Sequence, residues 1–230
     1  MHLVARDAEL ARLLEFLAGC DRGPSVLVLE GEPGIGKTAL LEAALAACSG
    51  LRLLRVRCAQ AESGAYVSLA DLLGPWIDTV LPALLPPLRR ALDIALLRAD
   101  AGPEVLEPHA VGRAALEALR LLAVDQPVLI AVDDVQWLDV ASERALGFAL
   151  RRLDAVPVSV LATRRGTGGP LPLGIDELAP AVRQDRVPVG PMPATDLTAL
   201  LEQRFGGRCP GAWCPGYRRR WPAIPCTPSS

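Results

Sequence analysis

A glycine-rich loop between two apolar segments constrains this chain more than any other feature. Ser25–Glu30 is a short apolar run, which is typical of a strand buried in a parallel sheet. The loop Gly31–Thr38, GEPGIGKT, matches the pattern G-x-x-x-x-G-K-[ST] in full, and Thr38–Ala47 is a strong helix former. A strand, a glycine loop and a helix in this order predict an α/β fold with the loop at the carboxyl edge of the sheet.

Each residue type in this loop has a physical role in binding phosphate. Glycines adopt backbone conformations closed to other residues, and backbone amides at the helix N-terminus direct positive dipoles at phosphate oxygens. Lys37, the one lysine among 24 Lys and Arg residues, is expected to reach the β- and γ-phosphates, and the Thr38 hydroxyl to bind Mg²⁺. The predicted site for ATP and Mg²⁺ comprises Gly31, Glu32, Pro33, Gly34, Ile35, Gly36, Lys37 and Thr38.

A pair of carboxylates follows the apolar segment Val128–Val132. A Mg²⁺ ion held by one threonine needs a carboxylate opposite, usually at the end of a neighbouring strand. Asp133 is therefore predicted to hold the metal, and Asp134 to polarise the attacking water as a catalytic residue. The alternative is that the pair caps the next helix.

A third group of candidates ends the apolar segment Val158–Ala162. Thr163, Arg164 or Arg165 could sense the γ-phosphate by a hydrogen bond or by charge, and we predict Arg164 as catalytic together with Lys37 and Asp134. The alternative is an ordinary surface arginine pair. His109 and Ser142 are expected to be a helix-start residue and a neighbour of a helix cap, not members of a catalytic triad.

Periodicity predicts helices and strands that alternate along the chain, so we expect a parallel sheet with helices on both faces. The further helices are expected at Asp7–Leu17, Ala110–Val124, Ala141–Leu153 and Thr195–Phe205, with several short helices in Ser68–Ala99 and strands at Leu51–Cys58 and Val187–Val189. Residues 208–230 hold five prolines, three cysteines, two tryptophans and four arginines, and no period survives there. We predict a disordered or irregular tail.

Charge and composition exclude several classes of protein. The net charge of −2 argues against a broad basic face for nucleic acid. Charged residues from Arg6 to Arg12 interrupt any apolar leader segment. The longest apolar stretch, Leu81–Leu88, is broken by three prolines, so no membrane span is expected. We therefore expect a cytoplasmic protein. The six cysteines form no C-x-x-C pair, and we predict that Cys20, Cys48 and Cys58 are small buried side chains, not zinc ligands.

Several segments together resemble a known family. Leu3–Leu10, LVARDAEL, is similar to the opening "hhGRExEL" of STAND-type ATPases and of AAA ATPases related to origin-recognition proteins. GEPGIGKT, VLIAVDDVQWLD at Val128–Asp139 and LRRLDAVPVSVLATRR at Leu150–Arg165 resemble the large LuxR-type ATP-binding transcriptional regulators. The similarity covers about residues 1–207, and Asp-Asp-x-Gln-Trp-x-Asp is its most specific part.

This resemblance implies an N-terminal AAA/STAND-type ATPase domain at residues 1–207 of a truncated regulator, with a P-loop NTPase fold of the additional-strand class. In that class the strand that carries Thr163–Arg165 lies between the strand before the glycine loop and the strand that ends at Asp133. It also implies contacts of Val4 and Arg6 with the adenine, although Ala5 stands where the family has glycine. The helix-turn-helix, the sensor and a complete lid are absent from these 230 residues, so we expect no specific DNA binding by this chain and leave self-association open.

Three functions are compatible with these observations. The first is a Mg-ATP-binding switch with weak ATPase activity from a LuxR-type regulator, and the second is a stand-alone kinase or nucleotide transferase. The third is a defective fragment that binds nucleotide weakly, for which the tail offers a hypothesis. Read one base earlier, a back-translation of Trp221–Thr227 encodes Val-Ala-Gly-Asn-Pro-Leu-Tyr, which resembles the start of the family's lid, so residues 208–230 would be a frameshift product.

Overall fold

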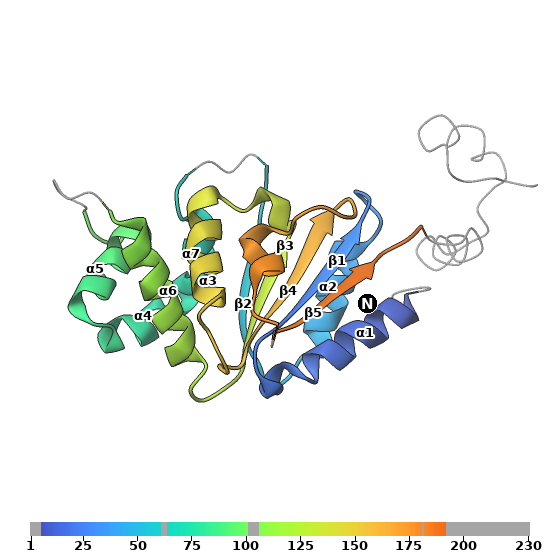
Figure 1. Ribbon diagram of the computed structural model, residues 1–230, viewed down its shortest axis with the longest axis horizontal. Helices are drawn as coiled ribbons and strands as arrows, with labels where there is room; N and C mark the ends of the chain where they lie inside the picture. The colour runs from blue at the N-terminus through green and yellow to red at the C-terminus, as the bar shows by residue number, and fades with distance from the viewer. Residues whose placement is uncertain (1–5, 61–63, 101–105, 181, 192–230) are drawn as a thin grey trace, which may run out of the picture.

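A parallel sheet of five strands forms the centre of the computed structural model, which describes residues 6–60, 64–100, 106–180 and 182–191 (Figure 1). The strands are β1 (Ser25–Gly31), β2 (Arg52–Arg57), β3 (Val128–Asp133), β4 (Val158–Arg165) and β5 (Arg183–Pro188). The α-helices are α1 (Asp7–Leu17), α2 (Lys37–Ala47), α3 (Val67–Leu73), α4 (Ile77–Val80), α5 (Pro86–Ala95), α6 (Pro108–Leu122) and α7 (Val140–Leu150).

The strand order β2-β3-β4-β1-β5 confirms the additional-strand fold. Strand β4 lies between β1 and β3 and pairs with both in parallel, with Ser25 opposite Ser159 and Val128 opposite Val158. Because all the strands point the same way, the carboxyl ends of β1, β3 and β4 meet at one edge of the sheet. That edge therefore carries the glycine loop, the two aspartates and the Thr163–Arg165 segment.

Alternate residues of the central strands supply two separate hydrophobic cores. Val26 and Val28 of β1 belong to a large core shared with α3, α5, α6 and α7, whereas Leu27 and Leu29 face a smaller core with α1 and α2. Figure 1 shows α1 and α2 on one side of the sheet and α3, α6 and α7 on the other. Burial on both faces explains why the central strands are continuous apolar runs.

Some element boundaries differ from the sequence-based prediction. The fifth strand is Arg183–Pro188 instead of Val187–Val189, because pairing with β1 recruits polar residues at an edge that is covered on one side only. Strand β4 continues to Arg165 because its partner β1 continues to Gly31, and α6 and α7 each begin earlier and end earlier than expected. The several short helices predicted after Ser68 are confirmed as α3, α4 and α5.

Several predictions lie outside the described residues: the helix Thr195–Phe205, the tail 208–230, the boundary at 207 and the position of Val4. No helix within the described ranges is long and apolar enough to cross a membrane. Cys20 and Cys58 are buried, as predicted, and Cys48 is partly buried. Over the same ranges, no three His, Cys, Asp or Glu side chains gather as a metal cluster.

Candidate functional site

The glycine loop connects β1 directly to the first turn of α2. Gly34 (φ 77°) and Gly36 (φ 106°) have positive φ, a conformation that L side chains rarely adopt. Gly31 is required for a different reason, since a Cβ atom there would lie 2.5 Å from the Val189 carbonyl oxygen. Backbone conformation thus accounts for Gly34 and Gly36, and a close backbone contact accounts for Gly31.

Lys37 begins α2, and its side chain folds back over the loop. The residue is 6% exposed, and its Nζ donates hydrogen bonds to the carbonyl oxygens of Gly31 (2.8 Å) and Glu32 (2.9 Å). Burial lowers the pKa of Lys37, and the negative charge of Asp134 opposes that shift. The ammonium group is therefore held at the loop by two consecutive backbone carbonyl oxygens.

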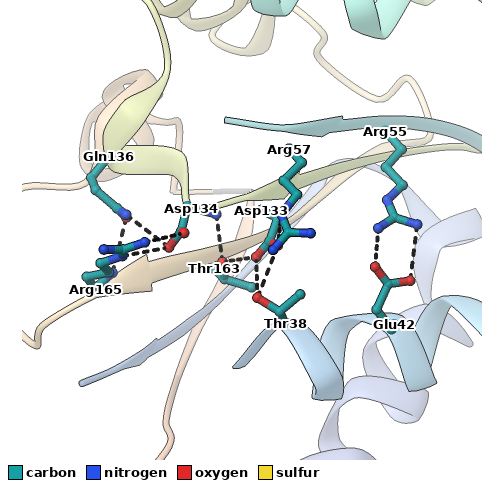
Figure 2. A network of polar contacts seen from close by, with 9 residues as sticks. All are labelled: Thr38, Glu42, Arg55, Arg57, Asp133, Asp134, Gln136, Thr163 and Arg165. Atoms are coloured by element: carbon teal, nitrogen blue, oxygen red, sulfur yellow. Dashed lines mark hydrogen bonds and ion pairs between the residues drawn. The ribbon is translucent and has the colours of Figure 1, made fainter. Parts of the chain in front are cut away.

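Asp133, at the end of β3, is the centre of a buried oxygen cluster (Figure 2). It is 1% exposed, and each of its carboxylate oxygens lies 3.1 Å from Thr38 Oγ1, which donates to them from α2. Thr163 on β4 donates to Asp133 Oδ1 at 2.7 Å and accepts from the Asp134 backbone N–H at 2.8 Å. Arg57 Nε, from the edge strand β2, lies 3.6 Å from Asp133 Oδ2. Three other segments, α2, β4 and β2, thus converge on the Asp133 carboxylate.

Asp134 follows in a left-handed conformation (φ 59°) that turns its side chain away from Asp133 and toward Arg165 (Figure 2). Arg165 donates to both carboxylate oxygens, at 3.2 Å and 2.8 Å, and Gln136 donates to Oδ1 at 3.0 Å. The hydrogen bond from Arg165 is the main reason why the pKa of Asp134 is lowered. The alternative that Asp134 caps a helix is wrong, because its side chain makes no cap hydrogen bond.

Arg164 is separated from these groups by the alternation of β4. Its neighbours Thr163 and Arg165 contact the aspartates, whereas Arg164 Nη1 lies 3.5 Å from Glu30 Oε1 and donates to the Gly169 carbonyl at 3.2 Å. The structure therefore brings Lys37 and Thr38 together with both aspartates, and leaves Arg164 beside Glu30. The catalytic role of Arg164 stays a prediction.

A family model described as "AAA ATPase domain" matches residues 2–161, which is more than half of the chain. The chain belongs to this family. A search of curated proteins gives no match. The match begins before α1 and extends into β4, so it includes the glycine loop and both aspartates.

Three solved structures have the fold of this AAA ATPase domain. A Walker-type ATPase of Pyrococcus abyssi is 17% identical at a TM-score of 0.55, with 94% of this chain and 63% of that chain covered. The Orc1 protein of Aeropyrum pernix, in complex with DNA, is 22% identical at 0.52, with 95% and 56% covered. Drosophila ORC bound to DNA is 20% identical at 0.53, with 88% and 47% covered. This chain thus spans less than two thirds of each of these three proteins.

Arg6 joins the N-terminus of the AAA ATPase domain to the glycine loop. The residue is 5% exposed, and its Nη2 donates to the carbonyl oxygens of Ile35 (3.1 Å) and Gly190 (2.8 Å), while Nη1 pairs with Glu9 at 2.8 Å. Two of its three nitrogens are therefore committed to protein partners. Its predicted contact with adenine stays untested, and the position observed is that of a brace between the loop and the residues after β5.

Asp139, the last residue of the Asp-Asp-x-Gln-Trp-x-Asp segment, connects two helices of the domain. Its Oδ1 accepts from the Ser142 and Tyr66 backbone N–H groups at 2.9 Å each, and its Oδ2 accepts from Ser68 N–H at 3.0 Å. Ser142 is the cap neighbour that the sequence predicted, and its hydroxyl accepts from Leu69 N–H at 2.9 Å. One carboxylate thus serves the N-termini of both α3 and α7.

Sequence reasoning missed the contacts of three side chains at or near the site. Gln136 and Asp139 lie within the segment that carries the family resemblance, so the sequence indicated that these residues matter. It did not indicate which residues they contact. Gln136 accepts from the Arg165 backbone N–H at 3.1 Å, across 29 positions of sequence. Arg57 carried no signal at all, since it is one of several arginines on β2.

Proposed function

We propose that this AAA ATPase domain binds Mg-ATP and hydrolyses it slowly, as the switch module of a LuxR-type transcriptional regulator. The observation that carries the proposal is the meeting of Thr38 with Asp133 beside the loop that holds Lys37. A lysine, a hydroxyl and a buried carboxylate around a glycine loop are the groups that a nucleotide triphosphate with its metal requires.

The residues present fit a magnesium ion. Mg²⁺ prefers hard oxygen ligands, and the Thr38 hydroxyl and the Asp133 carboxylate are such ligands held within hydrogen-bonding distance of one another. These two residues would hold the ion, which would neutralise charge on the phosphates. Thr163 would keep the Asp133 carboxylate oriented, because it donates a hydrogen bond to Oδ1. The same oxygen accepts from Thr38.

Slow hydrolysis is supported by the state of Asp134. To orient or polarise a water molecule, this carboxylate must present a free oxygen, yet Arg165 and Gln136 together donate three hydrogen bonds to it. Breaking part of that network adds to the barrier of the reaction, so we expect low turnover. A long-lived bound state is also what a switch needs, since its population must persist long enough to be read.

The regulator assignment depends on the resemblance of Val128–Asp139 and Leu150–Arg165 to LuxR-type proteins, within a chain that matches the AAA ATPase family. We propose a cytoplasmic protein whose nucleotide-bound form associates with itself or with a partner. Two of the similar structures, Aeropyrum pernix Orc1 and Drosophila ORC, are complexes with DNA, but we propose no specific DNA binding by these 230 residues.

The test is nucleotide affinity of the purified chain, measured by titration calorimetry with and without Mg²⁺. Lys37→Ala is expected to abolish ATP binding, whereas the matched variant Glu42→Gln on the same helix should bind as the parent does. Glu42 pairs with Arg55, away from the loop (Figure 2). Parent-like binding by Lys37→Ala would refute the assignment of the loop.

The two aspartates separate metal binding from hydrolysis. Asp133→Asn should remove the Mg²⁺ dependence of ATP affinity, and Asp134→Asn should keep affinity but slow the release of phosphate. Equal loss of binding in both variants would mean that the two roles are not separate. Undetectable ATP binding by the parent would favour a defective fragment, and steady transfer of phosphate to a small acceptor would favour a kinase.

A further inference from the structure

A cavity of about 310 Å³ opens between the N-terminal end of α6 and one side of α7, from Ala141 to Arg151, and no residue of the glycine loop lines it. Its walls include Tyr66, Pro108, His109 and Phe148, together with the side chains of Arg144 and Arg151. The volume lies near the lower end of the range for small-molecule sites, roughly 300–1,000 Å³. The cavity therefore suits a molecule of one or two rings.

One side of this cavity is an aromatic wall. The rings of His109 and Phe148 meet edge to face, with centroids 4.8 Å apart and planes at 79°. Tyr66 is 7% exposed, so its ring is fixed by the core beneath it. His109 is exposed, and Phe148 is half-buried with the Arg152 guanidinium 3.8 Å from its ring centroid, so the aromatic surface left for a ligand comes mainly from His109 and Tyr66.

The charged side chains that line the cavity, Arg144 and Arg151, are both cationic, while the nearby Asp139 carboxylate, which does not line it, accepts from the Tyr66 backbone N–H. Arg144 is exposed and has no ion-pair partner in the part of the chain that the structure describes, and no carboxylate is among the lining residues. Arg151 has one partner, Glu177, at 3.9 Å, but 76% of the Glu177 side chain is exposed, so that pair is weak. A negatively charged ligand would therefore give Arg144 the ion-pair partner that it lacks among the described residues.

Tyr66 is held in a fixed position at the edge of this cavity. It has a left-handed backbone (φ 64°), which is rare for a bulky residue, and Asp139 holds it there by accepting from its N–H at 2.9 Å. Burial raises the pKa of Tyr66, so its hydroxyl stays protonated as a donor, and the hydroxyl has no partner within the described residues.

We propose that this cavity is a binding site for a small organic anion with a flat apolar body. The carboxylate or similar group pairs with Arg144 and accepts from the Tyr66 hydroxyl, while the ring packs against the aromatic side chains that line the cavity. This site is separate from the proposed ATP site and does not depend on it. It borders the Asp139 cap, which lies five positions after Asp134 on the loop that follows β3.

Ligand-observed fluorine NMR on the full chain, without nucleotide, tests the proposal. The probes are 4-fluorobenzoate and its neutral analogue 4-fluorobenzamide, which differ in charge but hardly in shape. Benzoate is expected to bind one-to-one with a Kd on the order of 1 mM, an affinity that a ligand of about ten atoms can reach. The amide is expected to bind at least about tenfold more weakly, since it cannot pair with arginine.

Variants then locate the site. Arg144→Gln should weaken benzoate binding about tenfold, whereas Arg144→Lys should retain most of it because the charge remains. Arg113→Gln, an exposed arginine of α6 outside the lining, is the matched control and should bind as the parent does. Thermal unfolding of each variant checks that it is folded.

Three outcomes would overturn the proposal. They are no binding of benzoate at about 10 mM, ten times the expected Kd, equal binding of acid and amide, and parent-like binding by a folded Arg144→Gln variant. Loss of binding in Arg144→Gln with parent-like binding in Arg113→Gln supports it, whatever the ATP measurements give.

Discussion

Asp139→Asn is the change that most directly tests how this fold is held together. The substitution keeps the size of the side chain and the oxygen that accepts from Ser142 and Tyr66. It replaces the other oxygen with an amide nitrogen, which cannot accept from the Ser68 N–H. The N-terminus of α3 therefore loses a cap, and the two bonds that remain lose the assistance of the negative charge.

The expected cost follows from the three hydrogen bonds. A bond to a charged group contributes about 1.5–3 kcal/mol and a neutral one about 1 kcal/mol. Losing one charged bond and weakening two others should lower the free energy of unfolding by about 2–4 kcal/mol. Urea unfolding followed by circular dichroism measures it, with Asp125→Asn, an exposed loop residue, as the control expected to change it by less than about 0.5 kcal/mol.

The pH dependence gives a second signature. Burial by itself would raise the pKa of Asp139, but the hydrogen bonds from Ser142, Ser68 and Tyr66 outweigh it, and the pKa is lowered on folding. The contribution of Asp139 is therefore fully present above the unfolded pKa of about 3.9 and is lost as the pH falls through the folded value. The stability gap between the parent and Asp139→Asn should be constant at neutral pH and narrow below about pH 4.

Either of two results would refute this reasoning. A variant within about 0.5 kcal/mol of the parent at pH 7 would mean that the carboxylate does not hold the two helices. A gap that stays constant into acid would mean that the charge of Asp139 contributes nothing.

Three further changes test the surroundings of the glycine loop. Thr163→Val keeps the side-chain volume but removes the bridge between Asp133 and Asp134, so calorimetry should show weaker Mg-dependent ATP binding and urea unfolding a loss of about 1–3 kcal/mol. Gly31→Ala places a methyl group 2.5 Å from the Val189 carbonyl, and overpacking should cost about 1–3 kcal/mol; an unchanged stability would mean that the end of β5 yields freely. Arg6→Gln should lower ATP and GTP affinity by the same factor, because the brace acts on the loop; a loss confined to ATP would instead support contact with adenine.

The sequence predicted the parts of the site that are encoded locally. The glycine loop, its lysine and its threonine follow from eight consecutive residues, and two buried strands were readable as continuous apolar runs. The strand order also followed, through the family resemblance, and the observed position of β4 between β1 and β3 agrees with it. The bounds of β5 did not follow, because its residues are mostly polar and only pairing with β1 makes them a strand.

The sequence by itself thus determined that a phosphate-binding loop begins a helix and that two aspartates end a buried strand, since backbone conformation and periodic burial act over a few neighbouring residues. Only the tertiary structure decided which side chains those aspartates contact. Thr163 joins Asp133 to the backbone of Asp134 across 30 positions, and Arg165 holds Asp134 across 31. Such pairings depend on which strands lie side by side and on which face each residue points to. The residue types alone do not determine the strand neighbours or the face of each residue. A threonine or an arginine at a strand end has many compatible partners until the sheet brings one within about 3 Å.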